Sequence, residues 1–369
     1  MMTMAVALVV LLPSCGKGSG GAKLHRNEIK EASLLQMQRE AGYTLVTVSD
    51  PWSASRGKVL HRYALVPRDS VVPDSLPDGA TVVRVPIDTA LVYSSVHTAV
   101  LAELGALDAV KGVADAQYFN DAEIKRRLAA GTIADCGQSL SPDIEKVIAL
   151  TPDAVLLSPY QDATYGQITK LGVPIIECAD YMETTPLGRA EWIKFYGELV
   201  GQRERADSIY NAVAKHYNEL KEEIAAEGGN RPMVLTESVI NGVWNVPGGG
   251  SYMALLIEDA GGNYPWRDDD HTGSLSLDFN QVLERAQNAD VWLIKSRTIH
   301  SLADLRAAYS LNDRFAAFER RMVYVCDVER SDFFDTFPFH PDVLLQEYAQ
   351  IFHPQRYHDG VLRFFKPLE

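Results

Sequence analysis

Cysteine and long apolar stretches are scarce in this chain, and each shortage excludes a class of protein. Four cysteines occur in 369 residues, and no two of them form a Cys-x-x-Cys pair, which argues against a thiolate metal site. Cys136, Cys178 and Cys326 are an odd number, so at most one disulfide can form among them, and we expect small buried thiols. The apolar stretch of residues 4–12 is too short to span a bilayer.

The chain also has fewer positively than negatively charged residues and lacks two common catalytic motifs. The chain has 35 Lys and Arg against 49 Asp and Glu, a net charge of −14, so nucleic acid is not expected as a partner because its phosphates would be repelled. No H-E-x-x-H run occurs. Ser251 lies in GGSYM, where Met253 replaces the last glycine of a G-x-S-x-G elbow. An exported hydrolase with Ser251 as its nucleophile is therefore kept only as an alternative function.

The amino-terminal residues have the pattern of an export signal. Residues 4–12 are followed by Cys15 and a flexible GKGSGG segment, an arrangement that resembles a bacterial lipoprotein signal. In such signals the cysteine is acylated and becomes the first residue of the mature protein. We therefore expect lipidation at Cys15 and a lipid-anchored protein in the periplasm. An ordinary signal peptide with an incidental cysteine is the alternative.

One supersecondary pattern occurs twice in the chain. Residues 144–159 (IEKVIALTPDAVLLSP) and 280–296 (NQVLERAQNADVWLIKS) each contain a short amphipathic helix, a polar turn with an Asp and an apolar strand. Strands that alternate with helices form parallel sheets, because each helix carries the chain back across the sheet. Two such units predict two lobes of similar build, with a cleft between them where a small ligand can bind.

The segment between the repeats has the longest helical pattern. Apolar residues recur at helical spacing from Ala206 to Ile224 and form one stripe. A helix of about 25 residues spans about 37 Å, the width of a domain. We therefore predict an α/β fold in which two parallel-sheet lobes are joined by a single long α-helix, with a small antiparallel N-terminal attachment. The expected divisions are a signal at 1–15, a linker or arm at 16–42, a first lobe at 43–186, a helical linker at 187–229 and a second lobe at 230–369.

The order of these segments resembles a known family. It is similar to the substrate-binding proteins of bacterial ABC importers for cobalamin, haem and iron–siderophore complexes, the helical-backbone (class III) periplasmic binding proteins. The resemblance covers about residues 82–357 and depends on several segments taken together. These segments are VYSSVHTAVLAELGALDAVKGVAD, IEKVIALTPDAVLLSP, LGVPIIECAD, VPGGGSYMALLIEDAGG, ADVWLIKS and HPDVLLQEYAQIFHP.

The resemblance implies a function and a set of partners. The chain is expected to be no enzyme and to have no cofactor of its own. It would capture a metal-containing cofactor or chelate (cobalamin, haem or a ferric siderophore) between its lobes and deliver it to a permease and its ATPase. We expect a monomer that touches the membrane only through its lipid anchor. A surface lipoprotein that feeds an outer-membrane receptor is a further alternative.

Members of that family dock on the permease through one surface Glu in each lobe. In the first lobe the matching residue is Glu145. In the second lobe the matching residue is Asn280, which is not a carboxylate, so we expect Glu284 to replace it one helical turn later. Asp278 is an alternative on the same helix.

Ligands of open parallel sheets bind beyond the carboxyl ends of the strands, and this rule selects residues in both lobes. Many of them are aromatic, and Tyr and Trp bury a flat ligand while keeping a polar atom for a hydrogen bond. Taken alone, each aromatic residue also fits a place in a core. The predicted ligand-binding residues are Tyr93, Ser95, His97, Tyr160, Tyr165, Tyr181, Trp244, Ser251, Tyr252, Trp266, His271 and Arg330.

Two features near these residues each have two interpretations, and a third has one. His97 and His271 could ligate the metal of a ligand, although a lone histidine is more often a hydrogen-bonded structural residue, and no resident metal site is predicted. The glycines at 248–250 either present free N–H groups to an anion or form a tight turn. Arg330 is the expected anion clamp, because its planar guanidinium matches a carboxylate.

Overall fold

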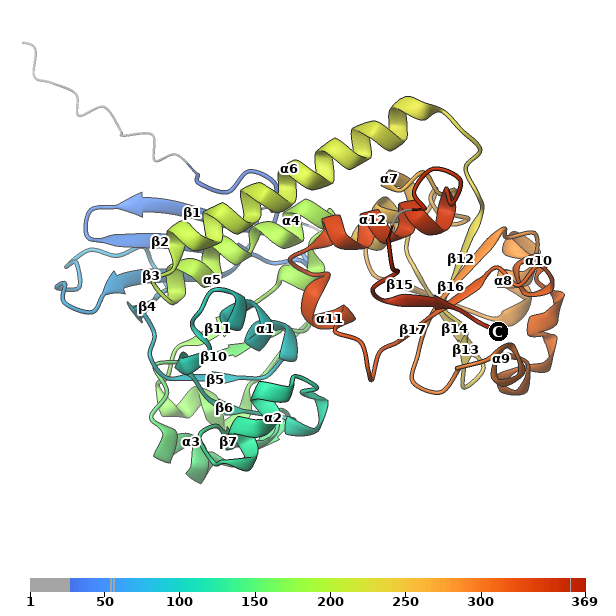
Figure 1. Cartoon of the computed structure of the whole chain (residues 1–369). Coiled ribbons are helices and arrows are strands. Elements are labelled where there is room, and N and C mark those ends of the chain that lie inside the picture. Colours follow the sequence, from blue (N-terminus) through green and yellow to red (C-terminus); the bar gives the residue numbers. More distant parts are fainter. Residues whose placement is uncertain (1–26, 54, 56, 359) are drawn as a thin grey trace, which may run out of the picture.

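The computed structural model describes residues 27–53, 55, 57–358 and 360–369. The predicted signal, Cys15 and most of the predicted linker therefore lie outside the described residues. Figure 1 shows two α/β lobes side by side, a long helix that reaches from one to the other, and a small sheet on the first lobe.

The N-terminal sheet consists of β1 (Leu35–Glu40), β2 (Tyr43–Ser49), β3 (Val59–Pro67) and β4 (Ala80–Val85), in that order. Residues alternate between buried and half-buried along β2, as expected for a strand with one face on a core. β1, β2 and β3 pair antiparallel, whereas β4 runs parallel to β3. The chain between β3 and β4 is long enough for the crossover that a parallel pair needs, so the predicted antiparallel attachment contains one parallel pair.

The first lobe is built on a five-stranded sheet in the order β11-β10-β5-β6-β7, in which all neighbours are parallel. Its central strands are short buried apolar runs, because helices cover both faces of such a sheet. The strands are β5 (Ala90–Val92), β6 (Val110–Val113), β7 (Ala134–Asp135), β10 (Ala154–Leu157) and β11 (Ile175–Glu177), with a hairpin of β8 (Gly137–Gln138) and β9 (Ser141–Pro142). The helices are α1 (Ser95–Glu103), η1 (Leu107–Ala109), η2 (Ala116–Tyr118), α2 (Ala122–Ala129), α3 (Ile144–Leu150), η3 (Gly166–Leu171) and η4 (Asp180–Met182).

The second lobe repeats this plan on a four-stranded sheet in the order β12-β16-β17-β18, with β18 antiparallel at the edge. A three-stranded antiparallel sheet, β13-β14-β15, lies beside it. The strands are β12 (Val234–Thr236), β13 (Val239–Ile240), β14 (Val243–Pro247), β15 (Ser274–Leu277), β16 (Val291–Ser296), β17 (Val323–Asp327) and β18 (Phe365–Pro367). The helices are α7 (Tyr252–Asp259), α8 (Phe279–Ala286), α9 (Leu302–Ala308), η5 (Ser310–Arg314), α10 (Ala316–Glu319), α11 (Phe333–Thr336) and α12 (Pro341–Phe352).

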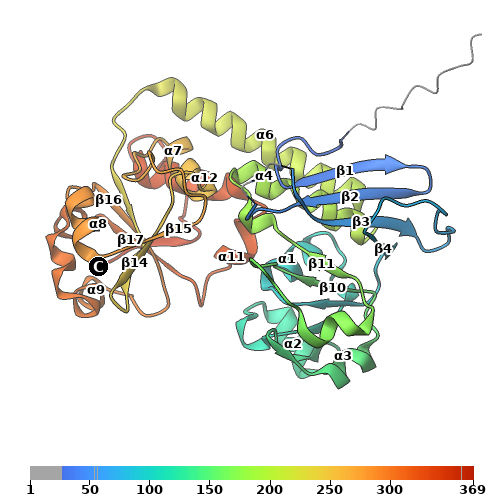
Figure 2. The same cartoon turned by 180° about the vertical axis from the view of Figure 1, so that it is seen from behind.

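The chain between the lobes forms three successive helices, α4 (Pro186–Glu191), α5 (Ile193–Leu199) and α6 (Arg203–Glu227). Of these, α6 is the long helix that reaches from one lobe to the other. α6 has 25 residues and packs on α5 of the first lobe and α12 of the second, as both views show (Figures 1 and 2). The predicted apolar stripe forms its buried face. The predicted fold of two parallel-sheet lobes joined by one long helix is therefore confirmed.

Two buried carboxylates hold the arm that leads into the N-terminal sheet. Glu191 of α4 is fully buried, and its carboxylate accepts hydrogen bonds from the backbone N–H groups of residues 30–32 at 2.6–3.1 Å. Glu183 accepts the N–H groups of residues 33 and 34, each at 2.9 Å. Bonds from N–H groups to ionised carboxylates are stronger than neutral ones. The arm is thus fastened directly to the helical connection between the lobes.

Two further sequence expectations concern thiols and membrane segments. Cys136, Cys178 and Cys326 are free and buried, which confirms the prediction of small buried thiols. No helix within the described part of the chain combines the length and the apolar character needed to traverse a bilayer.

Candidate functional site

A cavity of about 590 Å³ lies in the first lobe at the carboxyl ends of β5 and β10. We call it the first-lobe cavity. Tyr93 and Ser94 follow β5, and Ser158 and Tyr160 follow β10, so two adjacent parallel strands deliver them to one edge of the sheet. Tyr165 adds a third aromatic ring. Burial raises the pKa of Tyr93 to about 12, so its phenol is protonated at neutral pH and can donate a hydrogen bond.

A second cavity of about 550 Å³ lies between the lobes. We call it the inter-lobe cavity. The first lobe contributes Tyr181, and the second lobe contributes Tyr252 at the start of α7 together with the ends of β12 and β16. The Tyr181 hydroxyl donates a hydrogen bond to the carbonyl of Pro159, which stands between Ser158 and Tyr160 of the first-lobe cavity. This bond links the walls of the two cavities, and we call the two together the cleft.

Glu237 and Lys295 supply the charge of this cleft. They are the only charged residues among the described residues that line the two cavities, and they form an ion pair with one another. Glu237 directly follows β12 and has a φ of 62°, in a region that residues other than glycine rarely adopt. Backbone strain of this kind is concentrated at binding sites. The pair leaves the cleft lining with no net charge.

A buried guanidinium connects the lobes beside the inter-lobe cavity. Arg189 of α4 donates a hydrogen bond from Nη1 to the hydroxyl oxygen of Tyr252 at 2.7 Å, and its guanidinium lies 5.1 Å from the Tyr252 ring and 5.2 Å from the Phe337 ring. Its Nε lies 3.3 Å from Oδ2 of Asp180. Burial alone would raise the pKa of Asp180, but the nearby imidazole of His97, 3.8 Å away, and the charge of Arg189 bring that pKa below its ordinary value.

A family model described as periplasmic binding protein matches residues 91–326. The chain belongs to the periplasmic binding protein family. It is a solute-binding protein of the kind that serves ABC transport, and not an enzyme.

Relatives and solved structures agree with this membership. An uncharacterized lipoprotein of Methanocaldococcus jannaschii is 27% identical over 321 residues, which cover 82% of this chain and 75% of the relative. The fold is shared with a periplasmic haem-binding protein of Pseudomonas aeruginosa, at a TM-score of 0.57 and 16% identity over 77% of this chain and 95% of that one. It is also shared with an ABC-type Fe3+-hydroxamate transport protein of Saccharomonospora viridis, at a TM-score of 0.55 and 20% identity over 73% and 94%.

The structure of this periplasmic binding protein brings about half of the predicted ligand-binding residues to the cleft. Tyr93, Tyr160 and Tyr165 line the first-lobe cavity, and Tyr181, Ser251 and Tyr252 line the inter-lobe cavity. Ser251 also caps α7, since its side chain accepts the N–H of Ala254 and donates to the carbonyl of Gly248. Its hydroxyl is therefore occupied in a structural role. Ser95 opens α1, which packs on α11 across the lobe boundary.

Three predicted residues lie in the cores and not at the cleft surface. His97 is 1% exposed and faces Asp180. Trp244 is fully buried because its position in β14 points inward, where its ring stacks on Trp292. Trp266 is 4% exposed and packs on Tyr264. The sequence placed these residues near the expected edge of the cleft but did not show which way their side chains point, so the core interpretation holds for all three.

Two predicted residues are exposed and do not line the two cavities. His271 bonds to Asp269, and a hydrogen bond to that carboxylate raises the pKa of His271. Arg330 has a side chain that is 84% exposed and lies near Asp327 at the end of β17. Its predicted role as an anion clamp in the cleft is therefore not supported by its position.

The glycines at 248–250 form a tight turn. The N–H groups of Gly248 and Gly250 donate to the carbonyls of Gly273 and His271, and a Cβ at either glycine would come within 2.2–2.7 Å of those oxygens or of Asp270. Glycine is needed for this close approach of two backbones. These two N–H groups are already bonded to backbone carbonyls, so they are not available to an anion.

Sequence reasoning missed two residues of the site. Glu237 directly follows a strand, so the strand-end rule could have selected it, but its charge made a solvent position equally plausible. Arg189 gave no signal, because a cation in a helix normally lies at the surface.

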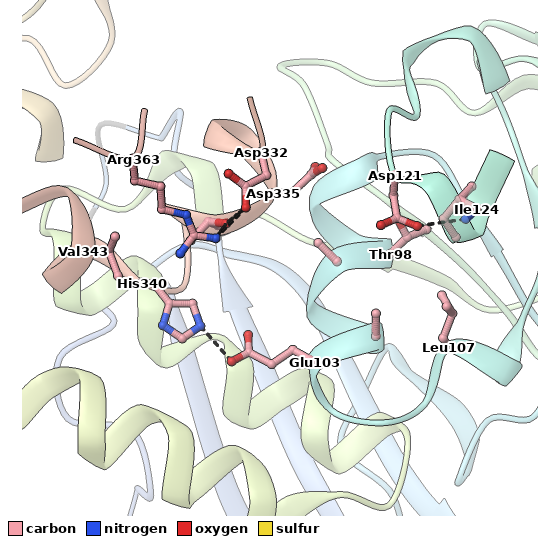
Figure 3. Close-up of a pocket in the computed structure, with 13 residues that line it drawn as sticks. Thr98, Glu103, Leu107, Asp121, Ile124, Asp332, Asp335, His340, Val343 and Arg363 are labelled. Atoms are coloured by element: carbon pink, nitrogen blue, oxygen red, sulfur yellow. Dashed lines mark hydrogen bonds and ion pairs between the residues drawn. The ribbon is translucent and has the colours of Figure 1, made fainter. Parts of the chain in front are cut away.

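A third hollow of about 350 Å³ lies between α1 and α2 of the first lobe and α11 and α12 of the second. None of the predicted ligand-binding residues lines it. Figure 3 shows Glu103 pointing across the lobe boundary toward His340, and Oε1 of Glu103 lies 2.7 Å from Nε2 of His340. This hydrogen bond raises the pKa of His340 above its ordinary value. The hollow is thus bridged by a contact between a carboxylate and a titratable imidazole.

Proposed function

We propose that this protein captures an uncharged metal chelate in the cleft and delivers it to the permease of an ABC importer. The observation that carries the proposal is the lining of the two neighbouring cavities, which is rich in tyrosine and has no net charge among its described residues. An anionic ligand would lose hydration in this cleft without gaining an unpaired cation, which disfavours its binding. Each cavity has the size of an ordinary cofactor site.

The hydrogen bonds of the tyrosines indicate what the ligand should present. Tyr165 donates its proton to Oε1 of Glu177 at 2.6 Å, and Tyr181 donates to the carbonyl of Pro159. Each of these hydroxyls can then only accept from a ligand. The Tyr252 hydroxyl accepts from Arg189, so its proton is available to a ligand acceptor. Tyr165 and Tyr181 therefore suit N–H or O–H donors of a ligand, and Tyr252 suits an acceptor of the same ligand.

The neutral lining supports a ranking of the ligand classes that similar proteins are described as binding. One structural neighbour is described as an Fe3+-hydroxamate transport protein and another as a haem-binding protein. A ferric trishydroxamate is neutral, whereas the propionates of haem are anionic acceptors. Cobalamin also carries many amide donors at its periphery. We therefore place ferric hydroxamates and cobalamin ahead of haem for this chain.

The proposed location and the proposed permease contacts also follow from membership of the family. Relatives of the chain are described as lipoproteins, which supports an anchor at Cys15 and a place in the periplasm. Glu145 of α3 and Glu284 of α8 are both exposed, as permease contacts must be. Both are the proposed docking residues, one for each lobe.

Calorimetric titration tests the ligand class. We expect a ferric trishydroxamate or cobalamin to bind with a micromolar or tighter Kd, and haem and molybdate to bind at least about tenfold more weakly, a difference of about 1.4 kcal/mol. Tyr165→Phe should weaken binding severalfold, because one hydrogen bond is worth about 1 kcal/mol. Tyr118→Phe is the matched control, since Tyr118 is exposed and lies outside both cavities. Tight binding of an anion with no binding of either neutral complex would overturn the proposal.

A further inference from the structure

The N-terminal sheet lies outside the part of the chain that the family model matches, which begins at residue 91. It nevertheless meets the first-lobe sheet at β11, which is an edge strand. An exposed edge strand leaves backbone N–H and C=O groups without partners. In this protein a side chain of the N-terminal sheet satisfies two of those groups.

That side chain is Tyr63 of β3, which is fully buried. Its hydroxyl donates to the carbonyl of Ile175 at 3.0 Å and accepts from the N–H of Glu177 at 2.8 Å. The hydroxyl therefore uses both its donor and its acceptor on β11. This double contact fixes the place of the N-terminal sheet against the last residues of the strand that leads to the cleft.

The neighbouring position on the same face of β3 carries His61. Its ring stacks on Tyr63 with a centroid separation of 4.4 Å. Nδ1 lies 2.9 Å from Oε2 of Glu177, and Nε2 lies 2.8 Å from Oγ1 of Thr81 on β4. With both ring nitrogens engaged, the imidazole has one defined orientation, and it holds one oxygen of the Glu177 carboxylate.

The other oxygen of Glu177 reaches the ligand cavity. Oε1 accepts the hydrogen bond from Tyr165, and Tyr165 lines the first-lobe cavity. Tyr165 directly precedes η3. The Glu177 carboxylate accepts the hydrogen bond of its hydroxyl and so supports the position of that hydroxyl. Thr81, His61, Glu177 and Tyr165 thus form a continuous chain from the N-terminal sheet to the cavity wall.

We propose that the N-terminal sheet is a working part of the ligand site, with His61 as a positioning residue that orients Tyr165 through Glu177. The inference rests on the proposed function of ligand capture. His61 does not line either cavity, so its effect on binding must be indirect. It follows from this proposal that ligand affinity depends on residues outside the segment that the family model matches.

The first test uses the protein labelled with 3-fluorotyrosine, without ligand. Tyr165→Phe identifies the Tyr165 resonance by its loss from the fluorine NMR spectrum. We expect His61→Ala to shift that resonance, and His61→Gln, whose amide can donate to Glu177, to shift it less. Thr81→Val removes the support of Nε2 while keeping the side-chain shape and should also shift it. His300→Ala, in the second lobe and outside both cavities, is the control and should leave it in place.

The second test is a double-mutant cycle on ligand affinity. We expect His61→Ala to weaken binding of the preferred chelate about fivefold in the wild-type background, the worth of one hydrogen bond, and to have little effect in the Tyr165→Phe background. A merely structural role would lower affinity equally in both. An unmoved Tyr165 resonance, or additive losses, would overturn the inference while chelate binding by the wild type would leave the proposed function intact. If no chelate binds, the proposed function fails, and the ligand-free resonance alone decides the link from His61 to Tyr165.

Discussion

A single buried cation, Arg189, joins side chains of both lobes. Its partners are the carboxylate of Asp180, the hydroxyl of Tyr252 and the ring of Phe337. A buried ion pair adds little net stability over an apolar substitute, but removing one partner is costly because the remaining charge stays buried and unpaired. Arg189 and Asp180 as a pair therefore add little to the stability of the fold, whereas the loss of Arg189 alone would leave Asp180 buried without its charged partner.

Replacing this cation should be strongly destabilising. We expect Arg189→Met to lower the free energy of unfolding by about 3–5 kcal/mol, because Asp180 loses its charged partner. Urea denaturation followed by circular dichroism measures the change. Arg320→Met is the matched control: Arg320 pairs with Asp290 at 3.0 Å, but its side chain is 58% exposed, so a change of at most about 1 kcal/mol is expected. Equal losses in the two variants would contradict this account.

At the residue scale the sequence predicted the cleft better than it predicted side-chain direction. The strand-end rule found Tyr93, Tyr165 and Tyr252, because the place where a strand ends follows from the chain pattern. It failed for Trp244 and His97, because the face toward which a side chain points depends on register and packing that appear only in three dimensions.

At the scale of elements, α6 is the element that the sequence predicted best. Its apolar residues recur at helical spacing, and the predicted length agrees with the 25 residues observed. β4 is the counter-example: its parallel pairing with β3 depends on the path of the intervening loop, which has no periodic signal. Periodic patterns are local, whereas the direction of strand pairing is set by the connection.

A proline in α6 should disrupt the connection between the lobes. Lys215 is well suited to this test, because its side chain is 74% exposed in the middle of the helix. We expect Lys215→Pro to cost about 3 kcal/mol or more, since it removes a backbone hydrogen bond and clashes with the preceding turn. Lys215→Ala should change the free energy of unfolding by less than about 0.5 kcal/mol. Thermal and urea unfolding followed by circular dichroism separate the two, and a tolerated proline would show that α6 is not a continuous rod in solution.

At the scale of the whole molecule, the lobes are also held together by the hydrogen bond between Glu103 and His340. The carboxylate of Glu103 raises the pKa of His340, Asp342 raises it further, and burial and Arg363 oppose the shift. A histidine whose pKa is higher in the folded than in the unfolded protein stabilises the fold fully below its unfolded value, about 6.5. That stability is lost as the pH rises through the folded value.

The contact should therefore make stability depend on pH. We expect the difference in unfolding free energy between the wild type and His340→Gln to be largest below about pH 6 and to shrink as the pH rises through the folded pKa. Other histidines are present in both proteins, so their titration cancels from the difference. Urea denaturation at a series of pH values measures it. A difference that stays constant with pH would show that the contact does not require a charged imidazole.

The fastening of the N-terminal arm has a mechanical consequence. Glu191 of α4 and Glu183, which lies shortly before α4, accept the backbone N–H groups of residues 30–34. α4 in turn contacts α5, α7 and α12. Tension along the arm therefore acts close to the contact between the lobes and exerts little torque on either lobe. The protein would thus be held close to the contact between its lobes, and the bonds of Arg189 and Glu103 across that contact would stay undisturbed.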